Sequence, residues 1–295
     1  MYERAKYKDN SAHDWAKVKD PVGTKKFDGG NFWMRVEPDG SLRYFSRRES
    51  VKGGFPERTN ALPHLTDKKL PQYSGNIYNV ELIHSGHSKK LVESHSALSG
   101  ILNSLPPKAI ATQKETGPVR AVLHNVIDPY LPTYKDKLLH MKEVQDAFGK
   151  PDLLYVTEPH VGLPAIRKLI EDTRARGEEG AVVTSLTEPE MSNTRIKIVH
   201  KVYYNLRIVG FEEELDKNGV PKNSLGSIVC ADSSGRIVGN VGTGFSKELR
   251  KEIWNNKPIW RNRIVQIKSL GLASQRLRGP VYNGIADGDV DKVLP

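Results

Sequence analysis

The sequence predicts an α+β fold in two parts, in which antiparallel sheets with helices are followed by a small β-barrel. Three observations support this prediction. Strand-like runs are separated by turn residues, amphipathic runs are bounded by proline and glycine, and strand-like runs dominate after about residue 201. A length of 295 residues suits one large domain or two smaller ones. We place the boundary near 203–206, which gives parts 1–203 and 204–295.

Turn residues and periodicity define the elements of the first part. Residues 1–25 predict a short lead-in helix that ends near Pro21, and 32–36 with 42–46 predict a hairpin around Glu-Pro-Asp-Gly. Residues 51–75 predict a loop with a short helix. The later predicted strands are 76–85, 119–126, 153–156 and 181–186, and the predicted helices are 89–105, stopped by Pro106, then 134–148 and 164–176.

The second part reads as five short strands with one helix. The strands are 204–211, 226–231, 237–242, 263–269 and 279–282, and the helix is 246–254. Residues 232–236, Asp-Ser-Ser-Gly-Arg, predict a hairpin turn. A helix between the third and fourth strands of such a set is typical of a barrel of the OB type.

Composition excludes several classes of protein. Hydrophobic residues make up 37% and charged residues 27%, so the chain can bury a core. No apolar run approaches the ~20 residues of a membrane span, and the N-terminus lacks the apolar stretch of a secretory signal. The single cysteine, Cys230, excludes an internal disulfide and any zinc site with two cysteines. We therefore expect a soluble, cytoplasmic, reduced protein without a membrane partner. The sequence does not show the oligomeric state, and a monomer is the simplest expectation.

The net charge of +10 is concentrated near the end of the chain. Residues 247–278 hold nine basic and two acidic side chains. This stretch is either a solvated helix face with loops or a surface that binds phosphates.

A candidate nucleophile stands before the first hairpin, in the run Lys26-Phe27-Asp28-Gly29-Gly30. A lysine becomes nucleophilic when burial or neighbouring cations depress its pKa. Glycines beside it let a ligand approach the backbone. Turn sequences of this kind also arise by chance.

Charged side chains recur at the ends and centres of later strands. Ser46-Arg47-Arg48 is either a solvated strand end or a phosphate contact, because a guanidinium suits phosphate geometry. Glu81, inside an apolar strand, faces either solvent or a ligand hydroxyl or metal. Glu179, before Gly180 and another apolar strand, is either a helix-end residue or a metal-facing carboxylate. Residues 195–201 alternate basic and apolar side chains, as in a charged sheet edge or a triphosphate contact.

In this order, the motifs resemble the covalent nucleotidyltransferases, which include ATP-dependent DNA ligases, RNA ligases and mRNA capping enzymes. The resemblance covers about 25–291, and it is strongest to the ATP-dependent DNA ligases. Residues 205–211 look like the start of their OB domain, and 241–246 look like a recurring segment within it. The length is similar to compact viral or bacterial ligases. The resemblance implies an adenylation (nucleotidyltransferase) domain at 1–203 and an OB-fold domain at 204–295.

The resemblance also implies a set of site residues. Lys26 matches the lysine that is adenylylated, and Glu81 and Glu179 match glutamates associated with metal. Residues implied in ATP binding are Lys25, Phe27, Asp28, Gly29, Arg47, Glu81, His124, Lys197 and Lys201. Residues assigned to nucleic acid are Arg47, Arg48, Lys247, Lys251, Arg261 and Arg263.

Several positions depart from the family pattern. Asn31 stands where the family often has arginine, and Val199 and Thr184 stand where it often has lysine. His124 replaces the aromatic residue that stacks on adenine, and a histidine there is either such a ring or a core residue. Residues 287–289 lie where a weak terminal motif is expected and do not align securely.

The function implied by the resemblance is ATP-dependent sealing of nicks in double-stranded DNA through a lysyl-AMP intermediate. Mg²⁺ is the expected metal, with Mn²⁺ as a substitute. Such an enzyme serves DNA repair, replication or recombination in a bacterium or a virus-infected host cell. The alternatives are an RNA ligase, a capping-type nucleotidyltransferase, or a non-catalytic OB-fold protein that binds nucleic acid. An NAD-dependent ligase is disfavoured because one cysteine cannot build the zinc finger of those enzymes.

Overall fold

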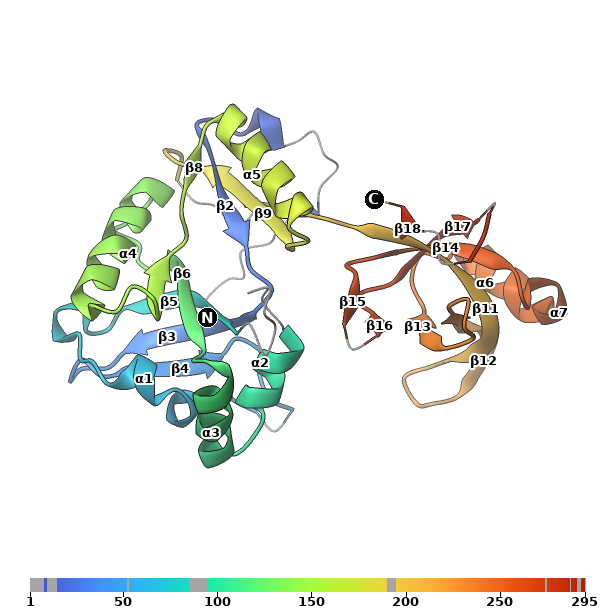
Figure 1. The fold of residues 1–295 in the computed structure, drawn as a ribbon, viewed down its shortest axis with the longest axis horizontal. Helices are drawn as coiled ribbons and strands as arrows, with labels where there is room; N and C mark the ends of the chain where they lie inside the picture. The colour runs from blue at the N-terminus through green and yellow to red at the C-terminus, as the bar shows by residue number, and fades with distance from the viewer. Residues whose placement is uncertain are drawn as a thin grey trace. The chain divides into compact units, whose positions relative to one another are not determined.

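The chain forms two compact units, Met1–Val199 (unit 1) and His200–Pro295 (unit 2). The computed structural model describes residues 8–9, 15–51, 53–84, 95–189, 195–273, 275–286, 288–290 and 293–294. Figure 1 shows two sheets with helices in unit 1 and a mainly β-stranded unit 2.

The described residues of unit 1 contain two five-stranded sheets. The first, sheet A, has the order β1-β10-β9-β2-β8. Helix α5 (Leu163–Ala175) packs on β2 and β9, and it buries Ile166 against Val183 and Ile196. Its proline at the second helical position is pre-set for a helix start. The strands are β1 (Lys8–Asp9), β2 (Pro21–Lys26), β8 (His160–Val161), β9 (Gly180–Ser185) and β10 (Ile196–Val199).

The second sheet, sheet B, has the order β4-β3-β5-β6-β7. Alternate residues of β3 point to opposite faces, so Phe32, Met34 and Val36 enter the core while Asn31 lies on the other face. The strands are β3 (Gly30–Val36), β4 (Leu42–Ser46), β5 (Ile77–Ile83), β6 (Arg120–Val126) and β7 (Leu154–Val156).

Helix α4 (Tyr134–Phe148) packs on β6 and β7 of sheet B. Thr133 and Asp136 form a capping box at its start, and Gly149, with φ 71°, ends it in the left-handed conformation. The other helical segments of unit 1 are η1 (Trp15–Lys17), η2 (Thr59–Ala61), α1 (Pro63–Thr66), η3 (Pro71–Tyr73), α2 (His95–Leu102) and α3 (Pro106–Thr116).

Unit 2 is built on one antiparallel sheet with the order β13-β12-β11-β14-β17, in which β18 also pairs with β11. A bridge between Thr243, just after β13, and Val281 on β17 brings the two edges of the sheet together at one end. The elements are β11 (Val202–Leu215), β12 (Pro221–Ala231), β13 (Ile237–Val241), α6 (Lys247–Asn255), α7 (Lys257–Trp260), β14 (Ile264–Ser269), β15 (Leu272–Ala273), β16 (Arg276–Leu277), β17 (Val281–Ile285) and β18 (Val293–Leu294).

The core of unit 2 lies between this sheet and α6. Ile253 of α6 packs with Ile228, Val241 and Val265 from the strands. Cys230 of β12 is buried in the same core, and burial raises the pKa of its thiol to about 12. In the part of the chain that the structure describes, no helix is long and apolar enough to cross a membrane.

Most of the predicted elements are confirmed, including the α+β class with antiparallel sheets. The hairpin at 32–46 corresponds to β3 and β4, and the predicted helix 134–148 coincides with α4. The helix between the third and fourth main strands of unit 2 is α6. Of the predicted helix 89–105, residues 89–94 lie outside the described residues.

The structure differs from the sequence-based expectations at two prolines. Where the structure describes the predicted lead-in helix, at 8–9 and from 15 onward, its only helical segment is the 3-10 turn η1, and Pro21 begins strand β2. The helix predicted before Pro106 does end there, since α2 ends at Leu102, but Pro106 also begins α3, which was not predicted. A proline can start a helix because it lacks only a backbone N–H that the first helical turn does not use.

Replacing Gly29 with alanine should destabilise unit 1. A Cβ at this position would lie 2.2 Å from the carbonyl oxygen of Leu82, so β5 and the chain before β3 would have to separate. We expect Gly29→Ala to lower the free energy of unfolding by about 1–3 kcal/mol in urea denaturation.

Gly100→Ala is the matched control. A Cβ at Gly100 of α2 meets no atom within 4 Å, so the variant should be neutral or stabilised by about 0.5–1 kcal/mol. Equal stability of the two variants would contradict the close approach at Gly29.

Candidate active site

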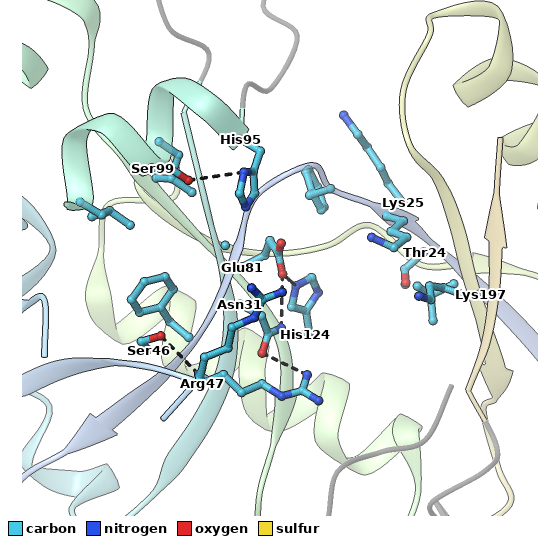
Figure 2. A pocket seen from close by; sticks show the side chains of 18 of the residues that line it. Thr24, Lys25, Asn31, Ser46, Arg47, Glu81, His95, Ser99, His124 and Lys197 are labelled. Carbon is cyan, nitrogen blue, oxygen red and sulfur yellow. Dashed lines mark hydrogen bonds and ion pairs between the residues drawn. The ribbon is translucent and has the colours of Figure 1, made fainter. Parts of the chain in front are cut away.

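A pocket of about 660 Å³ lies in unit 1. Side chains from sheet A, sheet B and α2 line it, and most of those near its centre are polar (Figure 2). Its size is within the range of small-molecule and cofactor sites. The predicted residues that line it are Lys25, Lys26, Phe27, Arg47, Arg48, Glu81, His124 and Lys197.

The segment 26–30, called the junction segment, joins β2 of sheet A to β3 of sheet B. Phe27 anchors it by packing with Ile83 and Val122 of sheet B. Gly29 allows the backbone to pass against the Leu82 carbonyl. The junction segment therefore fixes Lys26, at the end of β2, relative to both sheets.

Lys26 is paired with Glu179. Its Nζ lies 2.6 Å from Oε1 of Glu179, and both side chains are largely buried. Gly180 is opposite Lys26 in the ladder, with φ 140°, and a Cβ there would lie 1.9 Å from the carbonyl oxygen of Ile198. A glycine at 180 thus lets β9 pair closely with β10, directly after the carboxylate that contacts Lys26.

The two adjacent glutamates differ in their proton affinity. Burial raises the pKa of Glu179, and the negative charges of Asp28 and Glu81 raise it further, against the opposing effect of Lys26. For Glu178, burial is outweighed by hydrogen bonds from Arg176 and Lys25, which lower its pKa. Glu179 is therefore the carboxylate of this pair that more readily accepts a proton.

Besides Lys25 and Lys26, sheet A provides Lys197 to the pocket. Thr24, Val182 and Lys197 are paired in one row across β2, β9 and β10, and all three line the pocket. Val199 lies two residues beyond Lys197 and is paired with Gly180, in the row of Lys26. The family lysine expected at 199 would have stood in this row.

On sheet B, Asn31 connects two charged side chains. Its Nδ2 donates to Oε2 of Glu81 at 3.3 Å, and its Oδ1 accepts from Nη1 of Arg47 at 3.3 Å. Asn31 and Glu81 are direct partners in the β3–β5 ladder. Figure 2 shows this group at the centre of the pocket, with Lys25, Thr24 and Lys197 to one side.

A β-bulge places His124 beside Glu81. In the β5–β6 ladder Asn79 pairs with Asn125 and Val80 pairs with Leu123, which leaves His124 as the extra residue. A bulge redirects a side chain that regular alternation would place elsewhere. His124 Nε2 lies 3.5 Å from Oε2 of Glu81, and its ring is tilted against Phe27 at 6.5 Å. The histidine thus lines the pocket as a flat ring.

Helix α2, Asn103 just after it and Arg58 just before η2 line the pocket, although the sequence did not point to them. His95 and Ser99 lie on one wall, joined by a 3.4 Å hydrogen bond, and Arg58 donates to Asn103 at 3.5 Å. These are isolated polar residues in a loop and a helix, so only the folded chain brings them to the pocket.

The remaining predicted residues lie outside the pocket lining. Asp28 and Gly29 belong to the junction segment, and Glu179 contacts Lys26. Lys201 is exposed and belongs to unit 2. Lys247 and Lys251 are exposed one turn apart on α6.

Arg261 and Arg263, two residues of unit 2 predicted to contact nucleic acid, form hydrogen bonds within the protein. Arg261 donates to the carbonyl of Val209 at 3.2 Å. Arg263 donates to the carbonyl of Ile259 at 3.0 Å and lies over the ring of Trp260. Both keep further guanidinium donors for a ligand.

The described residues contain no group of three histidine, cysteine, aspartate or glutamate side chains placed to hold a metal ion. The charges of Asp28 and Glu81 nevertheless lie near enough to Glu179 to raise its pKa. Mg²⁺ is usually held by one or two carboxylates together with waters and substrate phosphates. The donor set therefore fits a magnesium ion brought by a phosphate ligand.

No protein-family model and no curated protein matches the sequence. Solved structures do match the fold. A chain from a structure–function analysis of Lig E DNA ligases, concerned with DNA binding by a minimal scaffold, aligns with a TM-score of 0.71 and 13% identity. The alignment covers 97% of this chain and 100% of that chain.

Two further structures, named Pmar-Lig_PreS3 and Pmar-Lig_Pre., align with a TM-score of 0.68 at 16% and 15% identity. They cover 91% and 94% of this chain, which spans 63% and 66% of their length. The resemblance to DNA ligases drawn from the motifs is thus confirmed at the level of the fold.

The adjacent glutamates should affect stability with opposite signs. The raised pKa of Glu179 means that the parent loses stability as pH rises above the ordinary value of 4.5, so Glu179→Gln should be more stable than the parent at neutral pH. The lowered pKa of Glu178 contributes stability above 4.5 that is lost as pH falls through the folded-state pKa, so Glu178→Gln should be less stable at neutral pH.

Urea denaturation of both variants across the acidic and neutral range measures these effects. Each difference from the parent should shrink in acid, where the carboxyl groups are protonated in both states. Destabilisation of equal size by the two substitutions would contradict the different environments of the two side chains.

Proposed function

We propose that this chain is an ATP-dependent DNA ligase that seals nicks in double-stranded DNA, with Lys26 as its nucleophile. The observation that carries the proposal is the 2.6 Å contact between Lys26 and the buried Glu179 at a pocket that Lys197 and Arg47 also line. An amine beside a proton acceptor and phosphate-binding cations suits attack on a nucleotide phosphate. The fold shared with Lig E DNA ligases supports DNA as the substrate.

The first step would transfer AMP to Lys26. The deprotonated Nζ attacks the α-phosphorus of ATP, and a nitrogen–phosphorus bond forms. The bond between the α-phosphorus and the bridging oxygen breaks, and pyrophosphate leaves with that electron pair. Glu179, with its raised pKa, would accept the proton that Nζ loses.

The pocket offers contacts for each part of ATP. Glu81 would accept a hydrogen bond from the ribose, and the rings of His124 and Phe27 would lie against adenine. Arg47, Lys197 and Lys25 would bind phosphates. Lys201, in unit 2, is proposed to replace the family lysine that is absent at Val199.

Glu81 and Glu179 would hold Mg²⁺, or Mn²⁺ in its place, together with the phosphates of ATP. Bound there, the ion would neutralise charge that develops on the phosphates. The residues of the chain would still orient the nucleotide and receive the proton.

The later steps would use DNA. An oxygen of the 5′-phosphate at a nick attacks the AMP phosphorus and releases Lys26, and the adjacent 3′-hydroxyl then displaces AMP to seal the strand. We infer that unit 1 is the adenylation domain and that unit 2 is an OB-fold barrel. The barrel would contact DNA phosphates through Lys247, Lys251, Arg261 and Arg263. Phosphate contacts position DNA without reading its sequence. We propose that the enzyme acts as a monomer.

Incubation with ATP and Mg²⁺ should add the mass of one AMP to the protein. Lys26→Ala should abolish the adduct. Among the described residues, Lys26 is the only lysine that forms an ion pair with Glu179. Intact-mass spectrometry, after removal of pre-bound AMP with pyrophosphate, measures the gain.

Lys19→Ala is the matched control, because Lys19 is exposed and lies outside the pocket lining. It should gain the adduct as the parent does. An adduct on Lys26→Ala would exclude Lys26 as nucleophile. A parent that gains mass from GTP but not from ATP would instead favour a capping-type enzyme, and no gain from either would favour a non-catalytic binding protein.

Removing the exposed lysines of α6 should weaken sealing without affecting the first step. We expect Lys247→Ala and Lys251→Ala each to reduce the salt dependence of binding to nicked duplex by about one counterion. Lysyl-AMP formation should stay at the parental rate. Fluorescence anisotropy at several salt concentrations and a nick-sealing assay measure the two effects.

Lys222→Ala serves as the control in unit 2, because Lys222 is already paired with Glu214 at 2.5 Å. It should leave the salt dependence unchanged. An unchanged salt dependence in both α6 variants would contradict a DNA contact at this helix.

A further inference from the structure

Asn31 occupies a position between two opposite charges. One amide separates the guanidinium of Arg47 from the carboxylate of Glu81, with a hydrogen bond of 3.3 Å on each side. The backbone strengthens the arrangement, since the backbone N–H of Arg47 also donates to the carbonyl oxygen of Asn31 at 3.3 Å. Arg47 is thus held to Asn31 through both its backbone and its side chain.

The chemistry of the three groups fixes the orientation of the amide. A guanidinium only donates hydrogen bonds and a carboxylate only accepts them. The amide oxygen must therefore face Arg47 and the amide nitrogen must face Glu81. Aspartate could satisfy Arg47 but would repel Glu81, and an apolar side chain could satisfy neither.

Without the amide, the two charges are free to meet. Glu81 is largely buried, with 13% of its side chain exposed, and charges attract more strongly in such surroundings than in water. Arginine and carboxylate form strong two-point pairs. A direct pair would occupy the guanidinium and the carboxylate that the proposed nucleotide site needs.

We propose that Asn31 is a positioning residue that acts as an uncharged spacer, keeping Arg47 and Glu81 from collapsing into a direct ion pair. Each charge then remains available to its part of the ligand, an anionic phosphate for Arg47 and a sugar hydroxyl for Glu81. This inference rests on the proposed function for the identity of the ligand, but the spacer itself is a property of the folded chain.

The spacer predicts an unusual pattern of ATP affinities. Asn31→Ala should weaken ATP binding about tenfold, the cost of losing one good contact to a charged group. In the parent, Glu81→Gln should also weaken binding. In the Asn31→Ala background the same Glu81→Gln change should weaken binding no further and should raise it to the level of the Glu81→Gln single variant, because it removes the carboxylate that captures Arg47. Isothermal titration calorimetry with ATP measures all four proteins.

A second measurement needs no nucleotide. The NMR signals of the Arg47 guanidinium should show slowed rotation about its C–N bonds in Asn31→Ala, because the Glu81 carboxylate would form two hydrogen bonds with it. They should return to fast rotation in Asn31→Ala/Glu81→Gln. Asn31→Ser, which is shorter and also uncharged, replaces the alanine variant if that variant does not fold.

Asn240→Ala is the matched control, because Asn240 donates to Glu212 at 2.7 Å between strands of unit 2. It removes an amide–carboxylate hydrogen bond and should leave ATP affinity and the Arg47 signals unchanged. Rescue by Glu81→Gln together with the change in rotation supports the spacer.

Additive losses of affinity, or an Arg47 guanidinium that rotates as fast in Asn31→Ala as in the parent, would overturn it. A parent that does not bind ATP would count against the proposed function instead. The NMR comparison would still decide whether Asn31 keeps the two charges apart.

Discussion

The passage of the chain from sheet A to sheet B constrains the rest of unit 1. Gly29 has room for no side chain because the Leu82 carbonyl would lie 2.2 Å from a Cβ. This contact brings the junction segment, which follows β2, close to the end of β5. As a result, Lys26 of one sheet and Glu81 of the other line one pocket, although they are 55 positions apart in the sequence.

The charges around this pocket are held in different ways. Glu179 meets Lys26 directly, whereas Glu81 and Arg47 meet through a neutral amide. Burial disfavours the charged form of Glu179 and so lowers the stability of the fold. Destabilising groups of this kind are common where a protein binds or transforms a ligand. The direct contact of Glu179 with Lys26 suits proton transfer. The separation of Glu81 from Arg47 leaves each charge able to bind its own part of a ligand.

Local signals allowed much of the fold to be predicted. The turn Glu-Pro-Asp-Gly marked the hairpin, and the periodicity before Gly149 marked α4. The order of short motifs pointed to Lys26, Arg47, Glu81 and Lys197, all of which line the pocket. The bulge at His124 and the wall formed by α2 depend on pairing between distant segments, which no local pattern encodes. The helix after Pro106 was missed because proline can both end and begin a helix.

The chemistry of Cys230 has a practical consequence. It is the only cysteine of the chain, it is buried, and its pKa is raised to about 12. The thiolate is the form that reacts with alkylating reagents, so this side chain will be inert to maleimide near neutral pH. A cysteine introduced at any exposed position would then be the single labelling site, and fluorophores or spin labels could be attached without first removing a native thiol.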